Sequence, residues 1–464
     1  MSEISNPGLR KQVDSKQDNI LFELVIIFAF VNSLGFPGNY TKAFGSSLGT
    51  LIEYTSFLLQ IIVMLMSSGD SLFNIKIVNL HRKYRSIYFL LIVFTVCSML
   101  VTISKSKELI SCVRVSVTAF FGIWIVENFS LKKLLEMIYT SQIIFIFFSV
   151  VFAVFFKRYR DWTSSYASYY IGLYGTKNQA GMELAFGMNM QILLLRVYNE
   201  EKRQISQFFF GFLALQAVLL VLTQSTGAMI VTLIPAVYIL HFEKKWGRDK
   251  WFQLPYLYII ASVGFIIFAL TVIQWFAPVL ESIGEDATLT GRVPLWNRVI
   301  EIMLQSHTLT GYGYGMFWFN ERAVNLFHAG FDENTWASKM TAGAHNVLMD
   351  MWLNVGLIGI GAYFMMLLDS FKDIKRLTEE QYLFSFIYVF SFMLHGFTER
   401  AFGTYDYHTL FLFLACAIGC NRTELIEERK DMEDGTDKRK KRIFQRDSRN
   451  NNLPKRVVRD RKSN

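Results

Sequence analysis

Charged side chains are scarce in this sequence of 464 residues. Asp, Glu, Lys and Arg make up 18% of it, whereas soluble domains average about 25%. Hydrophobic residues make up 52%, and the mean hydropathy is positive. The few charges lie in short stretches between long apolar runs. This pattern excludes an ordinary soluble protein of this length and indicates an integral membrane protein.

Cysteine is also scarce. The four cysteines all fall in or beside apolar runs, at Cys97, Cys112, Cys416 and Cys420. Their spacing fits neither a disulfide framework nor a metal site. The first residues are polar, and no small-residue cleavage pattern follows the first apolar run, so no cleaved signal peptide is predicted.

The net charge of +9 does not indicate nucleic acid binding, because the excess is concentrated in the C-terminal tail. Residues 421–464 hold 15 Lys and Arg and few apolar residues. Such a segment is typical of a disordered cytoplasmic end near anionic lipid. We therefore divide the chain into an N-terminal segment (1–19), a membrane domain (20–421) and a basic tail (422–464).

Twelve apolar runs approach the length of about 20 residues that a spanning helix needs. The sequence thus predicts an all-α polytopic membrane protein of about 12 transmembrane helices, with both termini on one side. Glu183, Asn189 and Gln191 interrupt the weakest run. The predicted spans are 20–36, 48–67, 86–104, 108–127, 137–156, 180–198, 206–223, 226–242, 254–276, 345–368, 382–398 and 404–421.

Basic residues fix the predicted orientation. With cytoplasmic termini, 34 of the 47 Lys and Arg lie in the cytoplasmic segments, as the positive-inside rule requires. The outer connections hold 12, and Arg114 lies within a helix, where it either snorkels or points into a cavity. The outer ones gather mainly at 157–177 and 292–339, where they meet either lipid headgroups or an anionic ligand.

One outer connection, residues 277–344 between the ninth and tenth predicted helices, is far longer than a usual helix–helix turn. It carries Trp296, Trp318 and Trp336, which is too aromatic for a linker. Its apolar residues recur at helical spacing between Trp296 and Met303. We expect a helical cap on the outer surface that carries the functional site.

Polar and glycine motifs stand in and after this loop. His345 opens the tenth helix, and Asn346, Asp350 and Asn354 follow at intervals of four. A polar stripe in an apolar span faces either a cavity or hydrogen-bonding partners on other helices. The loop itself contains Thr290-Gly291-Arg292 and the run Gly311-Tyr312-Gly313-Tyr314-Gly315.

Together these motifs resemble the O-antigen ligase and polymerase family, specifically its exopolysaccharide-polymerase-like branch. Ligases of the family often carry an acidic residue where Val355 stands here, which weakens a ligase assignment. The resemblance rests on Thr290-Gly291-Arg292 with Trp296, on the glycine run with Phe317-Trp318, on His345-Asn346 with Gly356-Leu357-Ile358-Gly359, and on Lys177-Asn178 and Ser225-Thr226-Gly227.

The resemblance implies a metal-independent glycosyltransferase without cofactors that joins undecaprenyl-diphosphate-linked repeat units. It places the reaction on the outer face of the bacterial plasma membrane. Arg292 is then the diphosphate-binding cation, with Lys177 and Arg114 as helpers, because a guanidinium binds two phosphate oxygens and stays charged. His345 acts as general base, or it binds phosphate or orients the sugar. Alternatively, Arg292 holds the loop by pairing with Glu285 or Asp286.

Further candidates for sugar or acceptor binding are Asn346, Tyr312, Tyr314, Trp318, Glu399 and Arg400. The aromatic rings either stack on sugars or pack the loop core, and Glu399 and Arg400 either join the site or pair with each other. Glu183, Gly187 and Gln191 share a helix face that lines a lipid entry or packs on neighbours.

Rival functions are a ligase or oligosaccharyltransferase with another acceptor, such as lipid A core, and a transporter or flippase. No paired halves with interrupted helices are visible, which disfavours a transporter, and a purely structural membrane protein leaves the organised loop unexplained. The partners expected besides membrane lipids are the lipid-linked glycan and a chain-length regulator and flippase of the same pathway. Nucleic acid is not among them.

Overall fold

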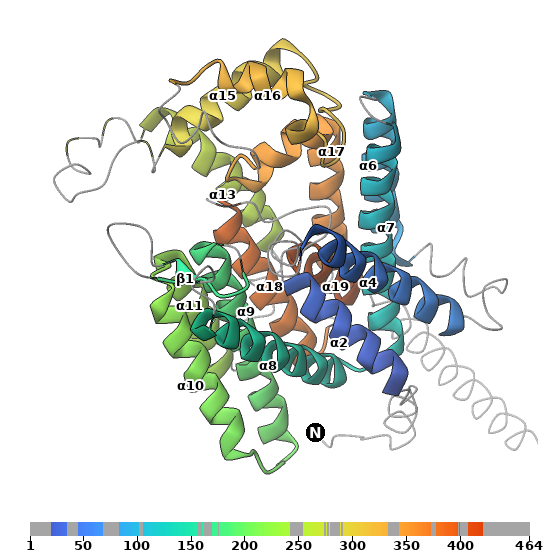
Figure 1. Cartoon of the computed structure of the whole chain (residues 1–464), viewed down its shortest axis with the longest axis vertical. Coiled ribbons are helices and arrows are strands. Elements are labelled where there is room, and N and C mark those ends of the chain that lie inside the picture. The colour runs from blue at the N-terminus through green and yellow to red at the C-terminus, as the bar shows by residue number, and fades with distance from the viewer. Residues whose placement is uncertain are drawn as a thin grey trace, which may run out of the picture. The chain divides into compact units, whose positions relative to one another are not determined.

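A computed structural model of the chain describes residues 20–34, 45–67, 83–101, 105–155, 160–161, 169–174, 176–241, 254–272, 275, 278, 288, 291–332, 343–372, 377–397, 399 and 407–420. Nearly all of these residues are helical (Figure 1). The two strands, β1 (Arg160–Asp161) and β2 (Tyr169–Tyr170), form one short antiparallel pair.

Each of the twelve predicted spans overlaps an α-helix, which confirms the all-α polytopic class. The helices are α2 (Ile20–Leu34), α4 (Ser46–Ser67), α6 (Arg85–Leu100), α7 (Lys105–Asn128), α8 (Leu131–Phe155), α9 (Lys177–Glu200), α10 (Gln207–Leu222), α11 (Thr226–His241), α13 (Leu254–Ile267) with the π-helix η2 (Phe268–Val272), α17 (Val347–Phe371), α18 (Glu379–Gly396) and α19 (Tyr407–Cys420).

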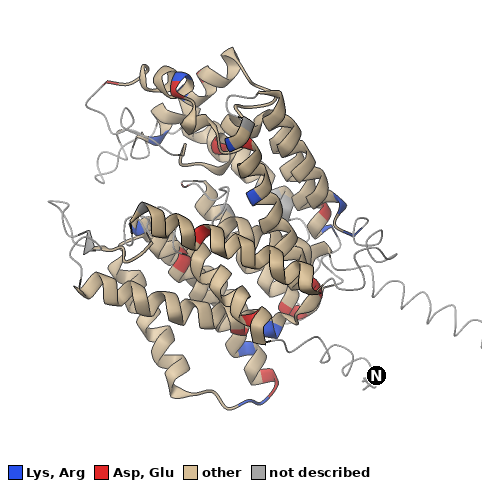
Figure 2. Cartoon of the chain, turned by 45° about the vertical axis from the view of Figure 1, so that its right-hand side comes forward, with Lys and Arg blue, Asp and Glu red and all other residues tan. Residues whose placement is uncertain are grey.

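Four of these helices, α4, α7, α8 and α17, are long and apolar enough to cross a membrane by length and composition. Others, such as α10, α11 and α19, are apolar but shorter within the described residues. Exposed apolar side chains such as Phe147, Val221 and Leu233 cover the outsides of the helices. Figure 2 shows few charged residues along the helical ribbon, as expected for a surface that faces lipid.

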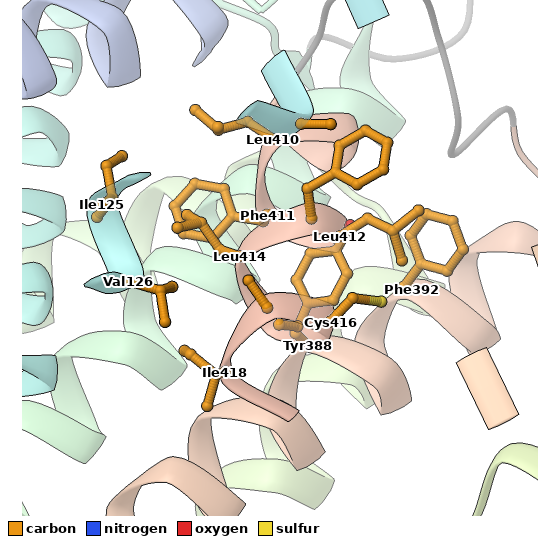
Figure 3. Packing of buried hydrophobic residues seen from close by; sticks show 14 of the residues in the cluster. Ile125, Val126, Tyr388, Phe392, Leu410, Phe411, Leu412, Leu414, Cys416 and Ile418 are labelled. Carbon is orange, nitrogen blue, oxygen red and sulfur yellow. The ribbon is translucent and has the colours of Figure 1, made fainter. Parts of the chain in front are cut away.

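Helix α19 lies at the centre of the packing. Its residues from His408 to Cys420 are all buried, and it contacts α2, α7, α17 and α18. Figure 3 shows Phe411 and Leu414 of α19 among Ile125, Val126 and Tyr388. Because lipid offers no hydrophobic gain for helix association, such close side-chain packing holds the bundle together.

The described part of the long loop between α13 and α17 contains two helices, α15 (Arg292–Gln305) and α16 (Glu321–His328), with the 3₁₀ turn η4 (Phe317–Phe319) between them. Trp296, Phe317 and Phe327 form its buried core together with Met349 and Leu353 of α17. The described part of the loop is therefore packed onto the N-terminal half of α17.

Main-chain hydrogen bonds join this loop to α17. Gly356 interrupts α17 with φ 65° and ψ −171°, a conformation that is essentially restricted to glycine. The interruption exposes amides of α17: Leu357 N donates to Thr308 O at 3.1 Å, and Ile358 N donates to Leu309 O at 3.1 Å. A Cβ on Gly356 would overlap the backbone of Leu309. The glycine motif thus lets the loop enter the break in the helix.

Candidate functional site

The carboxylate of Glu399, in the turn after α18, is the meeting point of three segments that lie far apart in the sequence. Its Oε1 accepts from Arg292 Nη2 at 2.8 Å and from Asn178 Nδ2 at 2.7 Å. Its Oε2 lies 2.8 Å from His345 Nδ1. The structure thus brings Arg292 and His345, the two predicted catalytic residues, onto one side chain.

Arg292 is the first residue of α15, and the turn before it explains the Gly-Arg motif. Gly291 has φ 81°, which glycine adopts without the steric cost of a Cβ. Its N–H donates to Thr288 Oγ1 at 2.8 Å, and Val293 N donates to Thr288 O at 3.0 Å. This turn directs the helix start, and with it the guanidinium of Arg292, toward Glu399.

His345 lies in a strained turn held from both sides. It has φ 51°, and Gly343 before it has φ 86°. Trp296 Nε1 of α15 donates to Ala344 O at 2.8 Å, and Ala344 N donates to Asp350 Oδ1 at 2.7 Å. Since Trp296 is fully buried, α15 fixes Arg292 and the backbone of His345 together.

Asn346 fixes the next residue of the same turn. Its Oδ1 accepts from Leu348 N and Met349 N at 3.0 and 3.1 Å, which caps α17. Its Nδ2 donates to Phe397 O at 3.0 Å, two residues before Glu399. Asn346 therefore ties the His345 turn to the Glu399 turn, and sugar binding by this residue stays a prediction.

Asp350 and Asn354 serve hydrogen bonding, one of the two alternatives for the polar stripe. Asp350 holds Ala344, while Asn354 Oδ1 accepts from Gly315 N at 3.1 Å. Tyr312 N also donates to Leu353 O at 2.8 Å. The stripe anchors the glycine run of the loop to α17.

Lys177 and Asn178 form the first turn of α9, and Asn178 faces the site. Asn178 bonds to Glu399, and Ser225 Oγ donates to Asn178 Oδ1 at 3.5 Å. The Lys177 ammonium lies 5.1 Å from the centre of the Tyr169 ring. Diphosphate binding by Lys177 therefore stays a prediction, whereas its neighbour Asn178 contacts the central carboxylate.

The site is partly open, because the side chains of Arg292, Glu399 and His345 are 18%, 15% and 32% exposed. Burial raises the pKa of Glu399, but the hydrogen bond and charge of His345, with smaller contributions from His395 and Arg292, outweigh it. The net effect lowers the pKa of this carboxyl from 4.5 to about 2. Glu399 is therefore an anion at neutral pH, held between cationic and polar groups.

Arg114 lies in α7 and pairs with a carboxylate of α4, Glu53 Oε1, at 2.8 Å. The rings of Tyr54 and Phe57 lie 5.3 and 5.7 Å from its guanidinium carbon. This ion pair satisfies a charge within the bundle. No contact in the described part of the chain joins Arg114 to Glu399, and its role toward diphosphate stays a prediction.

The three described aromatic candidates pack within the loop and against the bundle. Tyr312 contacts His307 and Phe317, and Trp318 contacts Phe317 and Phe327. The Tyr314 ring packs at a tilt against Phe94 of α6, with the ring centres 4.9 Å apart, and the backbone N–H of Tyr314 donates to Ser98 Oγ at 2.9 Å. These contacts fit the packing alternative, and sugar stacking by the three rings stays untested.

The polar face of α9 packs against its neighbours. Gln216 of α10 donates to Gln191 Oε1 at 2.6 Å, and Gly187 lies against the side chains of Gln142 and Gln216. Glu183 Oε1 lies 3.2 Å from His408 Nε2 of α19. Helix packing thus accounts for Gly187 and Gln191.

Several predicted residues lie outside the described residues: Lys157, Arg158, Glu285, Asp286, Trp336, Lys339 and Arg400. An observed partner of Arg292 is Glu399, for which the sequence left open a place in the site or a pair with Arg400. Sequence reasoning noted Asn178 and Ser225 only as parts of motifs. Their common signal is that each polar residue stands at or just before the start of a predicted span.

Comparison with known proteins adds to this geometry. Residues 211–364, from α10 into α17, match a protein family described as O-antigen ligase. The matched segment contains Arg292, the glycine run and His345, whereas Asn178 and Glu399 lie outside it.

The chain is also similar to the exopolysaccharide production protein ExoQ of Rhizobium meliloti (strain 1021). The two are 26% identical over 245 residues, which cover 51% of this chain and 53% of the relative. The chain thus matches about half the length of that relative. The resemblance to the O-antigen ligase and polymerase family is confirmed, and the chain is a multi-pass bacterial membrane protein.

Proposed function

From the O-antigen ligase match and the Arg292–Glu399–His345 cluster, we propose that this chain is a polysaccharide polymerase. It joins undecaprenyl-diphosphate-linked oligosaccharide repeat units on the outer face of the bacterial plasma membrane. The observation that carries the proposal is that one partly exposed carboxylate gathers a guanidinium and an imidazole. A cation for a diphosphate and a proton acceptor for a hydroxyl are the two groups that glycan transfer needs.

The reaction forms one glycosidic bond and breaks one sugar–phosphate bond. An acceptor hydroxyl attacks the anomeric carbon of the donor sugar, and the bond to the diphosphate oxygen breaks with its electron pair on oxygen. The hydroxyl proton passes to a base. Arg292 stabilises the charge that grows on the leaving diphosphate, and a fixed cation in a partly buried site does this effectively.

His345 is placed to accept the hydroxyl proton. Its Nδ1 faces the Glu399 carboxylate at 2.8 Å, and a carboxylate there favours the tautomer that carries the proton on Nδ1. The lone pair of that neutral ring is then on Nε2, which is the arrangement a general base requires. A ring that only orients the sugar would use the same contact, so substitution has to separate the two roles.

The proposed orientation has both termini in the cytoplasm, as the distribution of basic residues predicts. The site at the starts of α9, α15 and α17 then faces outward. We propose metal-independent transfer, because Arg292 provides fixed positive charge for the diphosphate. Purified protein should extend glycan in excess EDTA, and activity that needs added Mg²⁺ or Mn²⁺ would contradict this.

The test uses purified protein in proteoliposomes with undecaprenyl-diphosphate-linked repeat units. A polymerase lengthens glycan from this donor alone, which gel separation of the products would show. A ligase, the alternative that the family description favours, needs a second acceptor such as lipid A core. No product with either acceptor would refute glycan transfer.

Arg292→Lys tests the diphosphate contact. Lysine keeps an ion pair with Glu399 but loses the planar fork, so turnover should fall about 30- to 150-fold, equivalent to about 2–3 kcal/mol. Arg322→Lys is the control, since Arg322 is an exposed arginine on α16 of the same loop. Near-normal turnover of Arg292→Lys would show that the fork is not used.

A further inference from the structure

We propose that Glu399 is a positioning residue that sets the distance and orientation between Arg292 and His345 during transfer, with Asn178 as its support. This inference rests on the proposed function and assigns a role to a carboxylate outside the segment that matches the family. Glu399 touches the two groups that act on substrate and acts through them.

The first argument is the division of the carboxylate between its two oxygens. Oε1 accepts from Arg292, on the donor side of the proposed reaction, and Oε2 contacts His345, on the acceptor side. A carboxylate has both oxygens in one rigid plane, so the two partners are fixed relative to each other. The attacking hydroxyl and the leaving diphosphate must also be held in a defined geometry for reaction.

The second argument is that Glu399 is itself held in place. Asn178 donates to Oε1 at 2.7 Å, and Ser225 donates to the oxygen of the same Asn178 amide. The backbone amide of Glu399 donates to His395 O at 2.9 Å. Asn178 of α9 therefore holds the carboxylate, Ser225 just before α11 holds Asn178, and α18 holds the backbone of Glu399, which is the arrangement that fixes a positioning group.

The third argument concerns charge. When His345 takes up the hydroxyl proton, the ring becomes a cation beside the Glu399 anion, and the pair stabilises that state. Glu399 is itself a poor base, because its pKa is lowered to about 2. A carboxylate also repels the donor diphosphate, so Glu399 contributes little to donor affinity.

These arguments predict a specific kinetic signature for Glu399→Gln. The amide keeps the size of the side chain but loses its charge, so kcat should fall about 10- to 100-fold while the KM for the lipid-linked donor stays the same or decreases. Asn178→Ala should lower kcat less, about 3- to 10-fold, in the same pattern. Glu301→Gln, at a carboxylate that is 54% exposed, should match the wild type.

The experiment measures kcat and donor KM in proteoliposomes at matched protein amounts, for Glu399→Gln, His345→Ala and the double variant. If Glu399 acts through Arg292 and His345, the fold-loss of kcat in the double variant is smaller than the product of the two single losses. Effects that multiply in the double variant, or a Glu399→Gln variant with more than half the wild-type kcat, would overturn the positioning role. If Glu399→Gln does not fold, Asn178→Ala takes its place. The kcat of Asn178→Ala, His345→Ala and their double variant is then compared by the same criteria.

Failure of this inference differs from failure of the proposed function. An inactive His345→Ala variant beside a fully active Glu399→Gln variant removes only the role of Glu399. A fully active His345→Ala variant removes the proposed use of His345 itself. A wild-type protein without glycan product removes the function.

Discussion

His345 has a backbone conformation that a non-glycine residue seldom adopts. Its φ of 51° lies in the left-handed region, which costs about 1–2 kcal/mol for an L-residue. Hydrogen bonds of Trp296, Asp350 and Asn346 to the backbone on either side, two of them buried, hold the conformation in place. Strain that is maintained in this way is typical of functional positions.

Substitution of His345 separates the roles open to it. His345→Ala should reduce turnover at least 100-fold while the protein stays folded, because the side chain is one-third exposed and general bases contribute about 10²–10⁴-fold. If the ring is a base, His345→Gln is as inactive as Ala, since an amide does not accept the proton. Glycan assays at matched membrane levels measure both variants, and a Gln variant with most of the activity would favour an orienting role.

The lowered pKa of Glu399 predicts resistance of the site to mild acid. Since the folded pKa of about 2 is below the usual 4.5, its pairs contribute stability that is complete above about pH 5 and is lost as pH falls toward 2. Hydrogen exchange in the first turn of α15 and in 343–346, corrected for intrinsic rates, should be the same at pH 7 and pH 5. Loss of protection already at pH 5 in the wild type would contradict the lowered pKa of Glu399. The Glu399→Gln variant should lack the added protection at both pH 7 and pH 5.

Among the elements, the break in α17 at Gly356 is the place where the loop between α13 and α17 is attached to this helix. We call this contact the joint. The loop enters the break through backbone hydrogen bonds, and Gly311 approaches α17 so closely that a Cβ there would lie 2.5 Å from the Asn354 carbonyl carbon. The attached loop sets the position of α15, and α15 carries Arg292. A substitution in α17 that moves the loop therefore also moves α15 and the guanidinium of Arg292.

Gly356→Ala tests this joint. The added Cβ overlaps Leu309, and the conformation at Gly356 strongly disfavours alanine, so the loop should leave α17 and activity should fall by more than 10-fold. Gly361→Ala in the same helix is the control, because nothing lies within 4 Å of its Cβ position and alanine suits a helix. Protease cleavage within residues 291–332 in intact vesicles should increase only for Gly356→Ala. Equal protection of Gly356→Ala and Gly361→Ala would show that Gly356 is not needed to attach the loop to α17.

The glycine motifs at this joint could be recognised in the sequence, but the segments that they bring into contact could not be predicted from it. The run from Gly356 to Gly359 was noted as part of a resemblance, because glycine alone does not reveal which segment approaches it. The pairing of 308–312 with α17 joins segments about 45 residues apart, and no local pattern encodes such a pairing. Arg292 and His345 were predicted as site residues, whereas the central place of Glu399 depends on tertiary contacts.

For the whole molecule, hydropathy was sufficient to predict the twelve helical ranges. Apolar length determines where helices form in a membrane, so residues 20–421 could be interpreted span by span. The weakest predicted span became α9, whose polar residues find partners on α10, α11 and α19. The sequence alone could not identify those partners.

The predicted orientation can be tested with single cysteines in a variant that lacks the four native ones, all of which are buried. Cysteine in place of the exposed Asn325 on α16 should react with an impermeant thiol reagent outside intact spheroplasts. Cysteine in place of the exposed Gln204, between α9 and α10, should react only after the membrane is opened. The reverse pattern would place the site on the cytoplasmic face.

The convergence of distant segments on Glu399 also determines when the site can exist. Glu399 follows Arg292 by 107 residues and Asn178 by 221. At about 5–20 residues per second, a ribosome reaches Glu399 about 5–20 s after Arg292. During that interval the nascent chain already contains Arg292 but lacks the carboxylate that pairs with it. A growing chain therefore holds an incomplete cluster, and the contacts of Glu399 with Arg292, His345 and Asn178 form only after translation has passed α18.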